Sequence, residues 1–452
     1  MQNIKRDLND ILNVEAKQYG LYTLTNRAIP HLIDGFKPSH RFIMASALKD
    51  AGTSFTKVAS IAGNVSKYGY AHGENSAGEA GVLMASDWSN NVNVLEGRGN
   101  FGSRIIKDAA ASRYIYAKVH SNFNALFKDM NQNYEHPDTE IKIPQFYVPV
   151  LPIVLSNGIT GIATGFKTNI LPHSTEWLFK ASKEYAKTGD IKSRPVVEFP
   201  SFKGTVVDNN DGSYTQIGVY EALSPLQIKI TEIPTNSDWE KYTASLDKLQ
   251  DEGKIVSWED GTGEHGFEFT VKLKRDLKIN ANETDKINKL FKLEFKQTQL
   301  INIVTPGSDI NNLSNMYTLK TYEDARDVVK DFVDWIMANS LPKRISMNID
   351  EIKSKIDYNT AKIKFISDVN DNTLDLSKTT KKELAKIINS EYTSNEKSIE
   401  QLLRIPVYGL TKDEAIKAKE ELVEFKKSLE VWKCETPATQ LLSDLESLSV
   451  LK

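Results

Sequence analysis

The spacing of apolar residues changes twice along the chain. Residues 1–35 are predicted to form a helical arm that turns at Ile29-Pro30, and residues 36–125 alternate short helices with glycines. Between residues 145 and 310 the apolar residues gather in short runs separated by turn signals, which is typical of β-strands. The last third returns to helical spacing in long charged segments with almost no glycine. The pattern predicts an α+β protein with several domains.

Short strands are predicted in the β-rich middle part and just before it. The runs in the middle part are Val148–Leu155, Gly204–Val207, Leu226–Thr231 and Phe267–Leu273. Turn signals at Asn157-Gly158 and Asn210-Asp-Gly212 mark chain reversals in the same region. An earlier stretch, Ser112–Val119, alternates its side chains and is predicted to be a strand as well.

Two charged segments of the last third, Asp324–Ser340 and Thr411–Lys433, are predicted long helices. Thr411 and Glu414 form a capping box at the start of the second. Its apolar residues recur at spacings of three and four and share one face: Ala415, Ala418, Leu422, Phe425, Leu429 and Trp432. The helices predict an antiparallel coiled coil with a small module, residues about 360–410, at its tip. The pattern leaves open whether this pair dimerises or packs on its own core. Pro342 is expected to kink or end a helix.

The composition is that of a soluble globular protein. The chain has 452 residues, of which 40% are hydrophobic and 26% charged, enough for about three domains of roughly 150 residues each. It has no run of about 18 apolar residues that would span a membrane, and its charged N-terminus does not look like a signal peptide. The single cysteine, Cys434, excludes an internal disulfide and a zinc site made of cysteines. These features predict a cytoplasmic protein without a membrane partner.

Basic residues are concentrated in two segments, although the whole chain has a net charge of −3. Residues 37–73 hold five lysines or arginines against one aspartate, and residues 98–118 hold the same balance. Locally basic segments in a nearly neutral protein suit a defined nucleic-acid groove. Solvated helix faces explain the charge equally well, so charge alone does not decide.

A candidate phosphate site follows His72. Ser76 and Glu79 have the spacing of a capping box, which predicts a helix that starts near Ser76. The free N–H groups of such a helix start favour an anion such as a DNA phosphate. Another helix, predicted over Pro38–Asp50, precedes it and makes the pair a candidate helix-turn-helix. Capped helices are common, so this motif is weak evidence alone.

A candidate nucleophile lies near the end of the second basic segment. The glycine-rich stretch Gly97–Arg104 leads to Ala109–Tyr114, and its glycines allow a close approach of the backbone. A phenol with a pKa of about 10 is a poor nucleophile at neutral pH. A neighbouring guanidinium such as that of Arg113 favours the phenolate and stabilises charge on a phosphate. Most tyrosines beside arginines are simply packed or hydrogen-bonded, so the pair alone does not establish catalysis.

Six motifs occur in the order found in one enzyme family. They are Asn26–Pro30, Asp34–Arg41, Tyr70–Ser76, Gly99–Gly102, Ala109–Tyr114 and Asn157–Gly165, and shorter strings follow at Thr231–Pro234 and Gln297–Gln299. In this order they resemble gyrase A subunits and eukaryotic topoisomerase II, the type IIA DNA topoisomerases. The likeness covers roughly residues 10–345, and the helical remainder agrees in pattern only. The short chain is most similar to the form of this family found in T-even-type bacteriophages.

The resemblance implies a fold and a function. The implied domains are a helical arm (1–35), a winged-helix DNA-cleavage domain (36–150), an α/β tower domain (151–315), and a coiled coil with a dimerising helical C-gate (316–452). The implied function is that of the breakage and reunion subunit of an ATP-dependent type IIA topoisomerase. Such a subunit cuts and reseals both DNA strands through a 5′-phosphotyrosine. The complete enzyme is expected to relax or decatenate DNA without introducing negative supercoils.

The resemblance assigns roles residue by residue. It implies that Tyr114 attacks a DNA phosphate, that Arg113 supports the transition state, and that His72 donates a hydrogen bond to a phosphate oxygen. Ile162 matches the isoleucine that inserts between base pairs and bends the DNA; from the residues alone it would be a core residue. The remaining matches predict DNA contacts: Arg27, Lys37, His40, Arg41, Lys67, Asn75, Ser76 and Asn157.

The resemblance also implies what partners supply. The sequence shows no acidic cluster for catalytic Mg²⁺ and no ATP-binding region, so both cofactors are expected on a second polypeptide with ATPase and metal-binding (TOPRIM) domains. Double-stranded DNA and a second copy of this chain complete the expected assembly. Phe42 and Tyr70 replace an arginine and a histidine of gyrase, so DNA contacts there are expected to differ. Two alternatives stay open: a non-enzymatic winged-helix DNA-binding dimer, and a scaffold protein assembled by its helical arm.

Overall fold

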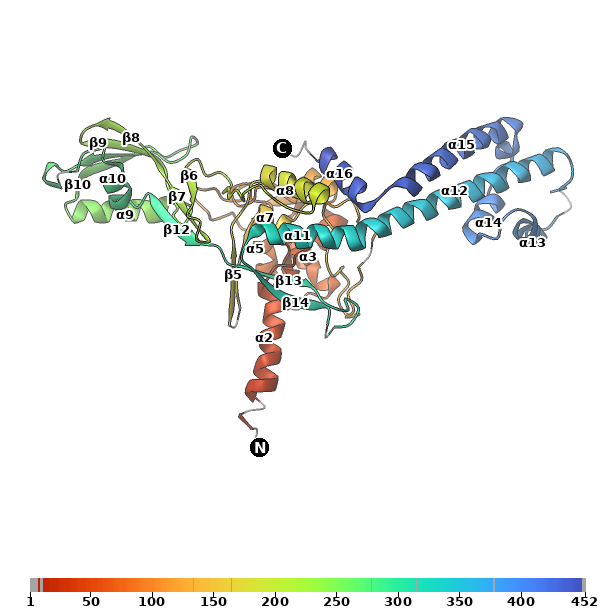
Figure 1. Cartoon of the computed structure of the whole chain (residues 1–452), viewed down its shortest axis with the longest axis horizontal. Coiled ribbons are helices and arrows are strands. Elements are labelled where there is room, and N and C mark those ends of the chain that lie inside the picture. Colours follow the sequence, from red (N-terminus) through yellow and green to blue (C-terminus); the bar gives the residue numbers. More distant parts are fainter. Residues whose placement is uncertain are drawn as a thin grey trace. The chain divides into compact units, whose positions relative to one another are not determined.

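The computed structural model describes residues 7–8, 11–132, 134–163, 165–277, 279–313, 315–376 and 379–448. The chain forms two compact units. Unit 1 comprises Met1–Asp334 and Asp444–Lys452, and unit 2 comprises Trp335–Ser443. Figure 1 shows the elements of each unit in the colours of the sequence. The limit between the units lies at residue 334, whereas the sequence placed a domain boundary at residue 315.

Unit 1 begins with helical turns. They are the π-helix η1 (Ile11–Ala16), α2 (Lys17–Thr23) and the π-helix η2 (Leu24–Ala28). The helix ends where Ile29 takes an extended backbone before Pro30, because a residue before proline disfavours the helical conformation. Leu24 packs against Val304 and ties this end of the helix to unit 1. Residues 1–6, 9 and 10 of the predicted arm lie outside the described residues.

Helices and a small antiparallel sheet follow the arm. They are α3 (Pro38–Asp50), β1 (Thr56–Lys57), α4 (Val58–Gly63), the 3-10 helix η3 (Asn64–Tyr68), α5 (Glu74–Met84), β2 (Leu95–Arg98), β3 (Tyr116–Val119) and α6 (Ser121–Leu126), with strand order β1-β3-β2. α3 has the predicted bounds and packs against α4 and α5. A helix does start near Ser76, as predicted, but the capping box assigned to Ser76 and Glu79 is wrong. α5 starts at Glu74 because Gly73 takes the extended N-cap backbone, and the Ser76 hydroxyl donates to Gly73 O at 2.9 Å.

The strand predicted over Ser112–Val119 is shorter in the structure. Only Tyr116–Val119 is paired, with β1 on one side and β2 on the other. Residues 112–114 form a turn in which Tyr114 N–H donates to Ala111 O at 2.8 Å. Tyr114 therefore lies on a turn that leads into the sheet and not within a strand.

The middle part of the chain is β-rich, as predicted. Its elements are α7 (Ile153–Ser156), β4 (Ile159–Ala163), β5 (Phe166–Ile170), α8 (Thr175–Thr188), β6 (Thr205–Asp208), β7 (Ser213–Ile217), β8 (Val219–Ser224), β9 (Gln227–Glu232), α9 (Trp239–Asp251), β10 (Ile255–Asp260), β11 (Phe269–Leu273), the 3-10 helix η4 (Arg275–Leu277), α10 (Thr284–Leu290), β12 (Glu294–Thr298), β13 (Ile301–Pro306), β14 (Tyr317–Tyr322) and α11 (Ala325–Trp335). The strands form a four-stranded sheet β10-β11-β9-β8, a three-stranded sheet β12-β7-β6, and the pairs β4-β5 and β13-β14.

Three of the four runs predicted in this part are strands, and one is not. β6, β9 and β11 cover most of the predicted runs, and the turn at Asn210-Asp-Gly212 joins β6 to β7. The run Val148–Leu155 is instead an irregular segment that ends in α7. Pro149 and Pro152 have no N–H for a strand ladder, and the run is buried throughout. A wholly buried apolar run does not by itself separate strand from helix.

The four-stranded sheet has its own core beneath α9. Ile228 and Ile230 of β9 and Phe269 and Val271 of β11 pack in one apolar cluster with residues of α9. All four of these strand side chains are fully buried. Alternate residues of each strand therefore supply the core, as in any strand with one buried face.

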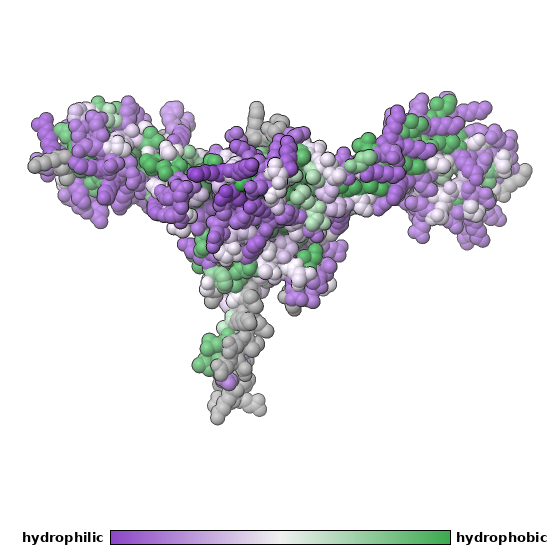
Figure 2. Space-filling view, in the orientation of Figure 1, coloured by the Kyte–Doolittle hydropathy of each residue, from purple (hydrophilic) through white to green (hydrophobic). Residues whose placement is uncertain are grey.

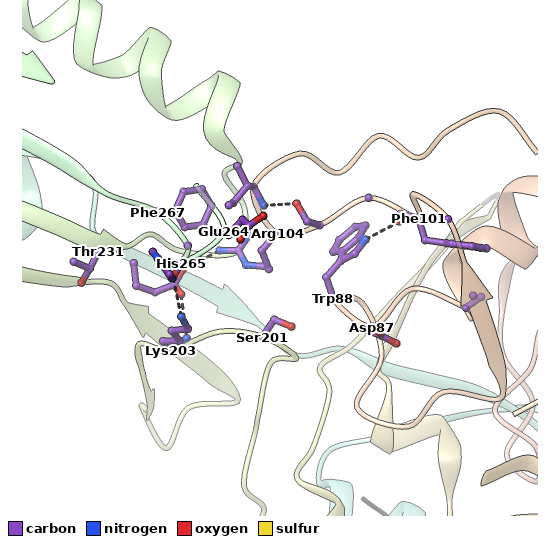
Figure 3. Close-up of a pocket in the computed structure, with 18 residues that line it drawn as sticks. Asp87, Trp88, Phe101, Arg104, Ser201, Lys203, Thr231, Glu264, His265 and Phe267 are labelled. Carbon is purple, nitrogen blue, oxygen red and sulfur yellow. Dashed lines mark hydrogen bonds and ion pairs between the residues drawn. The ribbon is translucent and has the colours of Figure 1, made fainter. Parts of the chain in front are cut away.

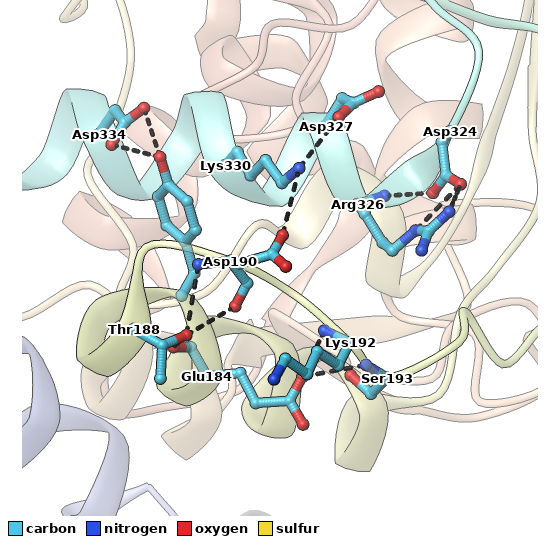
Figure 4. Close-up of polar contacts among 11 residues, drawn as sticks. Glu184, Thr188, Asp190, Lys192, Ser193, Asp324, Arg326, Asp327, Lys330 and Asp334 are labelled. Atoms are coloured by element: carbon cyan, nitrogen blue, oxygen red, sulfur yellow. Dashed lines mark hydrogen bonds and ion pairs between the residues drawn. The ribbon is translucent and has the colours of Figure 1, made fainter.

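Polar side chains join α8 to α11 on the surface of unit 1 (Figure 4). The Tyr185 hydroxyl donates to Asp334 at 2.9 Å, and burial together with Asp334 raises the pKa of this phenol to about 12. Lys330 lies 3.8 Å from Asp190 and 3.6 Å from Asp327. Hydrophilic residues dominate the middle of the face shown in Figure 2, where these helices lie. Exposed ion pairs and hydrogen bonds of this kind add little to the stability of the fold.

Unit 2 contains a long helix pair and a small helical module. The elements are the π-helix η5 (Ile336–Ser340), α12 (Leu341–Asn370), α13 (Lys381–Glu391), α14 (Glu396–Leu403), the 3-10 helix η6 (Val407–Leu410), α15 (Lys412–Cys434) and, crossing into unit 1, α16 (Pro437–Ser447). α12 packs along α15. The six apolar residues predicted to share a face of α15 are buried or half-buried. Pro342 lies in the first turn of α12, which continues directly from the π-helix η5. The helix therefore does not end at Pro342, and the five residues before α12 have π-helical instead of α-helical hydrogen bonding. Residues 377 and 378 lie outside the described residues.

None of the described helices is both long and apolar enough to cross a membrane.

Apolar clusters lie within each unit, and the one in unit 2 joins Phe365 of α12 to Ile388 of α13 and Leu402 of α14. The small module is therefore held to the long helix by apolar packing.

A buried histidine predicts that acid destabilises the chain. His173 is fully buried, and burial lowers its pKa to about 4. Between pH 6.5 and 4 the unfolded chain therefore binds a proton that the folded chain does not, so stability falls as the pH drops. The full effect is about 3 kcal/mol. Urea unfolding of wild type and His173→Leu at pH 8 and pH 5 measures it. The expected result is a smaller loss between the two pH values in the variant, and equal losses would contradict the assignment.

Candidate active site

Tyr114 projects from the surface of unit 1 beside Arg113. The Tyr114 side chain is 66% exposed. The Arg113 guanidinium carbon lies 4.8 Å from the centre of the Tyr114 ring, within the range of a cation–π contact. The structure thus brings the predicted nucleophile and its cation together. It also leaves the phenol open to a large substrate.

The backbone under Tyr114 is held on both sides of the turn. Ala59 N–H donates to Ser112 O at 3.1 Å, and Val58 N–H donates to Ile115 O at 3.0 Å. Ile115 is buried, in contrast to the tyrosine before it. These bonds anchor the turn to the start of α4. An exposed side chain on an anchored backbone suits a group that must meet its target in a defined position.

The glycine-rich loop packs on the segment that carries Tyr114. Gly99 has a φ of +117°, and a Cβ there would lie 2.9 Å from the Ile115 side chain. Gly102 has a φ of +80°, and a Cβ there would lie 2.5 Å from Lys107 O. The close backbone approach predicted for these glycines is therefore made to the protein's own chain. Ala110 N–H donates to Asn100 O at 3.0 Å and closes the loop at its base.

His72 belongs to a second cluster of polar and aromatic groups. Its Nε2 is hydrogen-bonded to the Tyr22 hydroxyl at 3.3 Å. Its ring meets the Tyr70 ring edge-on, with centroids 5.5 Å apart. The Tyr70 hydroxyl lies 3.1 Å from Ser76 Oγ. A cavity of about 220 Å³ opens beside this cluster, and Arg41 forms part of its wall. His72 itself is exposed.

Arg27, Lys37 and Ile162 line one groove of about 670 Å³. Ile162 is 76% exposed and belongs to the hairpin β4-β5, so it is not the core residue that its type alone would indicate. The Lys37 ammonium donates to Thr160 O at 2.8 Å, and burial lowers the pKa of this lysine. A Cβ at Gly161 would lie 2.0 Å from Ala28 O. Only glycine lets this hairpin rest against the end of η2.

Three residues predicted to contact DNA have other partners in the structure. Arg41 is buried, and its Nε and Nη2 donate to Asp34 at 2.6 and 3.0 Å. Asn157 both accepts from Val92 N–H and donates to Val92 O, each at 2.8 Å. The pKa of His40 is lowered to about 3 by burial and by the cations Lys37 and Arg41. Arg41 and Asn157 are thus engaged within the protein, and the low pKa of His40 leaves it neutral at physiological pH. The DNA contacts of these three residues stay predictions.

The other predicted contacts lie on the surface near α5. Lys67 lies in the last turn of η3, and Asn75 and Ser76 lie in the first turn of α5. All three are exposed. Their positions leave them open to a ligand.

Two exposed cations near the turn of Tyr114, Lys57 and Arg98, were not predicted individually as site residues. In the sheet, Tyr116 is paired with Lys57 of β1 and with Arg98 of β2, and both cations are exposed. The two cations thus lie beside Tyr116, the second residue after Tyr114. The local basic charge of these segments indicated a positive surface, but only the strand register places both cations next to Tyr116.

The described residues contain no group of three or more histidine, cysteine, aspartate or glutamate side chains that could hold a metal ion.

Comparison with known proteins identifies the family. Residues 27–446 match the family model that describes the A subunits of DNA gyrase/topoisomerase IV. The DNA topoisomerase medium subunit of Enterobacteria phage T4 is 41% identical over 455 residues, which cover 99% of this chain and 100% of that protein. DNA topoisomerase 2 of Plasmodium falciparum is 26% identical over 98% of this chain, which spans only 34% of that protein.

The fold agrees with this match. The crystal structure of the DNA-binding, cleavage and re-ligation domain of Plasmodium falciparum topoisomerase II superimposes with a TM-score of 0.85 and 26% sequence identity. The match covers 98% of this chain and 64% of that one. This chain therefore belongs to the family of DNA gyrase/topoisomerase IV A subunits, the DNA cleavage and religation subunits of type II DNA topoisomerases.

Proposed function

We propose that Tyr114 is the nucleophile with which this subunit cuts and reseals DNA. The observation that supports the proposal most directly is an exposed phenol, on an anchored turn, beside the guanidinium of Arg113. A guanidinium at that place can stabilise the negative charge that develops on a phosphate during the attack. Lys57 and Arg98 would add to the attraction of the DNA backbone.

The proposed reaction is a reversible transesterification. The phenol releases its proton to solvent, and its oxygen forms a new bond to phosphorus while the bond from phosphorus to the 3′-oxygen breaks. The 3′-oxygen takes up a proton and leaves as a hydroxyl, and the 5′-phosphate stays on the tyrosine. The new ester retains much of the energy of the old one, so the reverse reaction reseals the strand without ATP.

The groove of Arg27, Lys37 and Ile162 is proposed to hold the duplex near the cut. The two cations suit phosphate contacts, which fix the register of a duplex without reading its sequence. Lys67, Asn75 and Ser76 would extend these contacts along the start of α5, where free N–H groups favour phosphate. Ile162 would enter between base pairs, since an apolar wedge can unstack and kink DNA.

The complete enzyme is proposed to need partners. Mg²⁺ and ATP are assigned to a second polypeptide, because this chain spans about a third of a single-chain relative and its described residues contain no cluster of three or more histidine, cysteine, aspartate or glutamate side chains. A second copy of this chain would cut the opposite strand, and unit 2 is proposed to join the copies. Passage of another duplex through the break would then relax or decatenate DNA in the cytoplasm of a host cell.

Trapping of the cut DNA tests the proposed reaction. The chain, its partner, Mg²⁺ and end-labelled duplex are mixed and stopped with detergent. The expected product is protein linked to the 5′ end of the cut strand, with Tyr114 in the peptide that carries the nucleotide. A linkage to the 3′ end, or to another residue, would contradict the mechanism. The absence of any adduct would favour a non-enzymatic DNA-binding dimer.

Substitution of Ile162 tests the proposed wedge. Ile162→Ala is expected to lower the DNA bend and to slow cleavage about tenfold, because the cost of unstacking is no longer offset by an apolar insertion. The melting temperature is expected to stay unchanged, since the side chain is 76% exposed. Fluorescence transfer between the ends of a short duplex reports the bend. Val256→Ala, in an exposed position of β10, is the matched control. Equal bending by both variants would rule out the wedge.

A further inference from the structure

The tip of the glycine-rich loop is fastened to the link between β9 and α9, residues 233–238. Arg104 donates from Nη2 to Ile233 O at 2.9 Å and from Nη1 to Ser237 O at 3.2 Å. Lys107 Nζ donates to Thr235 O at 3.0 Å. We call the contacts of Arg104 and Lys107 with residues 232–237 the strap. Its partners lie more than a hundred residues apart in the sequence.

Arg104 is also paired with a carboxylate at the end of β9. Its Nη2 lies 3.3 Å from Glu232 Oε1, and both side chains are more than nine-tenths buried. Figure 3 shows Arg104 reaching from the loop toward the turn that carries Glu264 and Phe267. The guanidinium carbon lies 5.5 Å from the centre of the Phe267 ring. A cavity of about 370 Å³ separates the rest of the loop from this turn, so the strap is a localised connection between the two parts.

The buried ion pair of Arg104 and Glu232 leaves little freedom of movement to either side chain. Glu232 also accepts from Ile233 N–H at 3.0 Å and from Lys203 N–H at 3.2 Å, which fixes the carboxylate. Buried charges are costly unless their partners and hydrogen bonds are in place. A shift of the β9–α9 link is therefore expected to carry Arg104 along rather than break the pair.

The loop between the strap and the tyrosine is braced internally. Ser103 N–H donates to Ile106 O at 2.7 Å at the tip, and Ala110 N–H donates to Asn100 O at 3.0 Å at the base. Gly102 N–H donates to the Asn100 side chain at 2.9 Å. The base lies four residues before Tyr114, whose turn follows at once. A displacement at the tip would reach the turn through these bonds, against the backbone bonds that hold the turn to the start of α4.

We propose that Arg104 is a positioning residue for DNA cleavage, which through the strap sets the place of Tyr114 according to the place of the four-stranded sheet. DNA that moves this sheet would move the tyrosine with it. The inference rests on the proposed nucleophile but concerns a residue that touches neither DNA nor the reacting atoms. A misplacement of a reacting group by about 1 Å costs on the order of 100-fold in rate.

Single-turnover cleavage by the complete enzyme at saturating DNA tests the strap. Arg104→Met combined with Glu232→Gln removes both buried charges together, so neither is left unpaired. The expected result is about 100-fold slower cleavage with DNA affinity within about twofold of wild type. Arg104→Lys keeps the charge but cannot reach both carbonyls, and it is expected to be intermediate. Lys229→Met with Glu268→Gln removes an exposed ion pair (2.8 Å) from the same sheet and is the matched control.

The outcomes separate this inference from the proposed function. If wild type forms no adduct, the proposed function fails. If wild type forms the adduct and the strap variants cleave as fast as the control, the positioning role of Arg104 is wrong and the proposed function still stands. A parallel loss of DNA affinity, or a loss of cleavage explained by a lower melting temperature, would also overturn the positioning role. If the double variant does not fold, Lys107→Met provides the test instead, because it removes a partly buried contact of the strap. It is expected to slow cleavage roughly fivefold, the worth of one hydrogen bond, and an unchanged rate would overturn the inference.

Discussion

Tyr114→Phe is expected to abolish the covalent adduct and to slow DNA cleavage at least about 1,000-fold. Phenylalanine keeps the ring beside Arg113 and removes only the oxygen that would bond to phosphorus. The anchored turn does not depend on that oxygen, because its bonds are made by backbone groups. DNA affinity and the melting temperature should therefore stay close to those of wild type. Detergent-trapped complexes and filter binding measure the two effects side by side.

Tyr116→Phe provides the control for this experiment. Tyr116 is the first residue of β3, is 37% exposed, and lies between Lys57 and Arg98. It shares the basic surroundings of Tyr114 but not the turn. Its substitution is expected to leave adduct formation unchanged. If the adduct still forms in Tyr114→Phe and is lost in Tyr116→Phe, the nucleophile is Tyr116 and not Tyr114.

Asp34→Ala is expected to destabilise unit 1 by about 3–5 kcal/mol. The Asp34 carboxylate is fully buried and accepts from both Arg41 nitrogens, from Phe36 N–H at 3.0 Å and from Tyr147 N–H at 3.1 Å. Its removal leaves the Arg41 guanidinium buried without its counter-charge, which is the costly half of a broken buried pair. Urea unfolding followed by circular dichroism measures the loss.

An exposed aspartate gives the comparison. Asp276 is 84% exposed and lies 3.9 Å from Lys274, so Asp276→Ala is expected to cost less than about 1 kcal/mol. If Arg41 served DNA and not the fold, Asp34→Ala would leave the unfolding midpoint in place. That result would support the DNA contact predicted for Arg41 from the sequence.

Local patterns predicted the regular elements well where one face is buried. The alternation in β9 and β11 and the three-and-four spacing in α15 correspond to burial on one side. The same patterns failed where both sides are buried, as in Val148–Leu155. They also failed at Ser76, where a cap was assigned from spacing while the backbone turned earlier, at Gly73.

The candidate site was predictable as far as its signals are local. Tyr114 follows its arginine directly, and the glycines before it mark a loop. The buried pairing of Arg41 with Asp34 was not predictable from charge, because the two side chains become partners only after the turn at residues 32–34 brings them together. Arg104 shows the limit most clearly, since its partners lie about 130 residues further along the chain.

The contact of Gly161 with Ala28 has a mechanical consequence. The hairpin that carries Ile162 rests directly on the carbonyl at the end of a helix, with no side chain between them to compress. A force on the isoleucine tip is therefore borne by backbone atoms in line with the arm. If Ile162 meets DNA as proposed, this backbone support would make the duplex and not the hairpin the part that deforms.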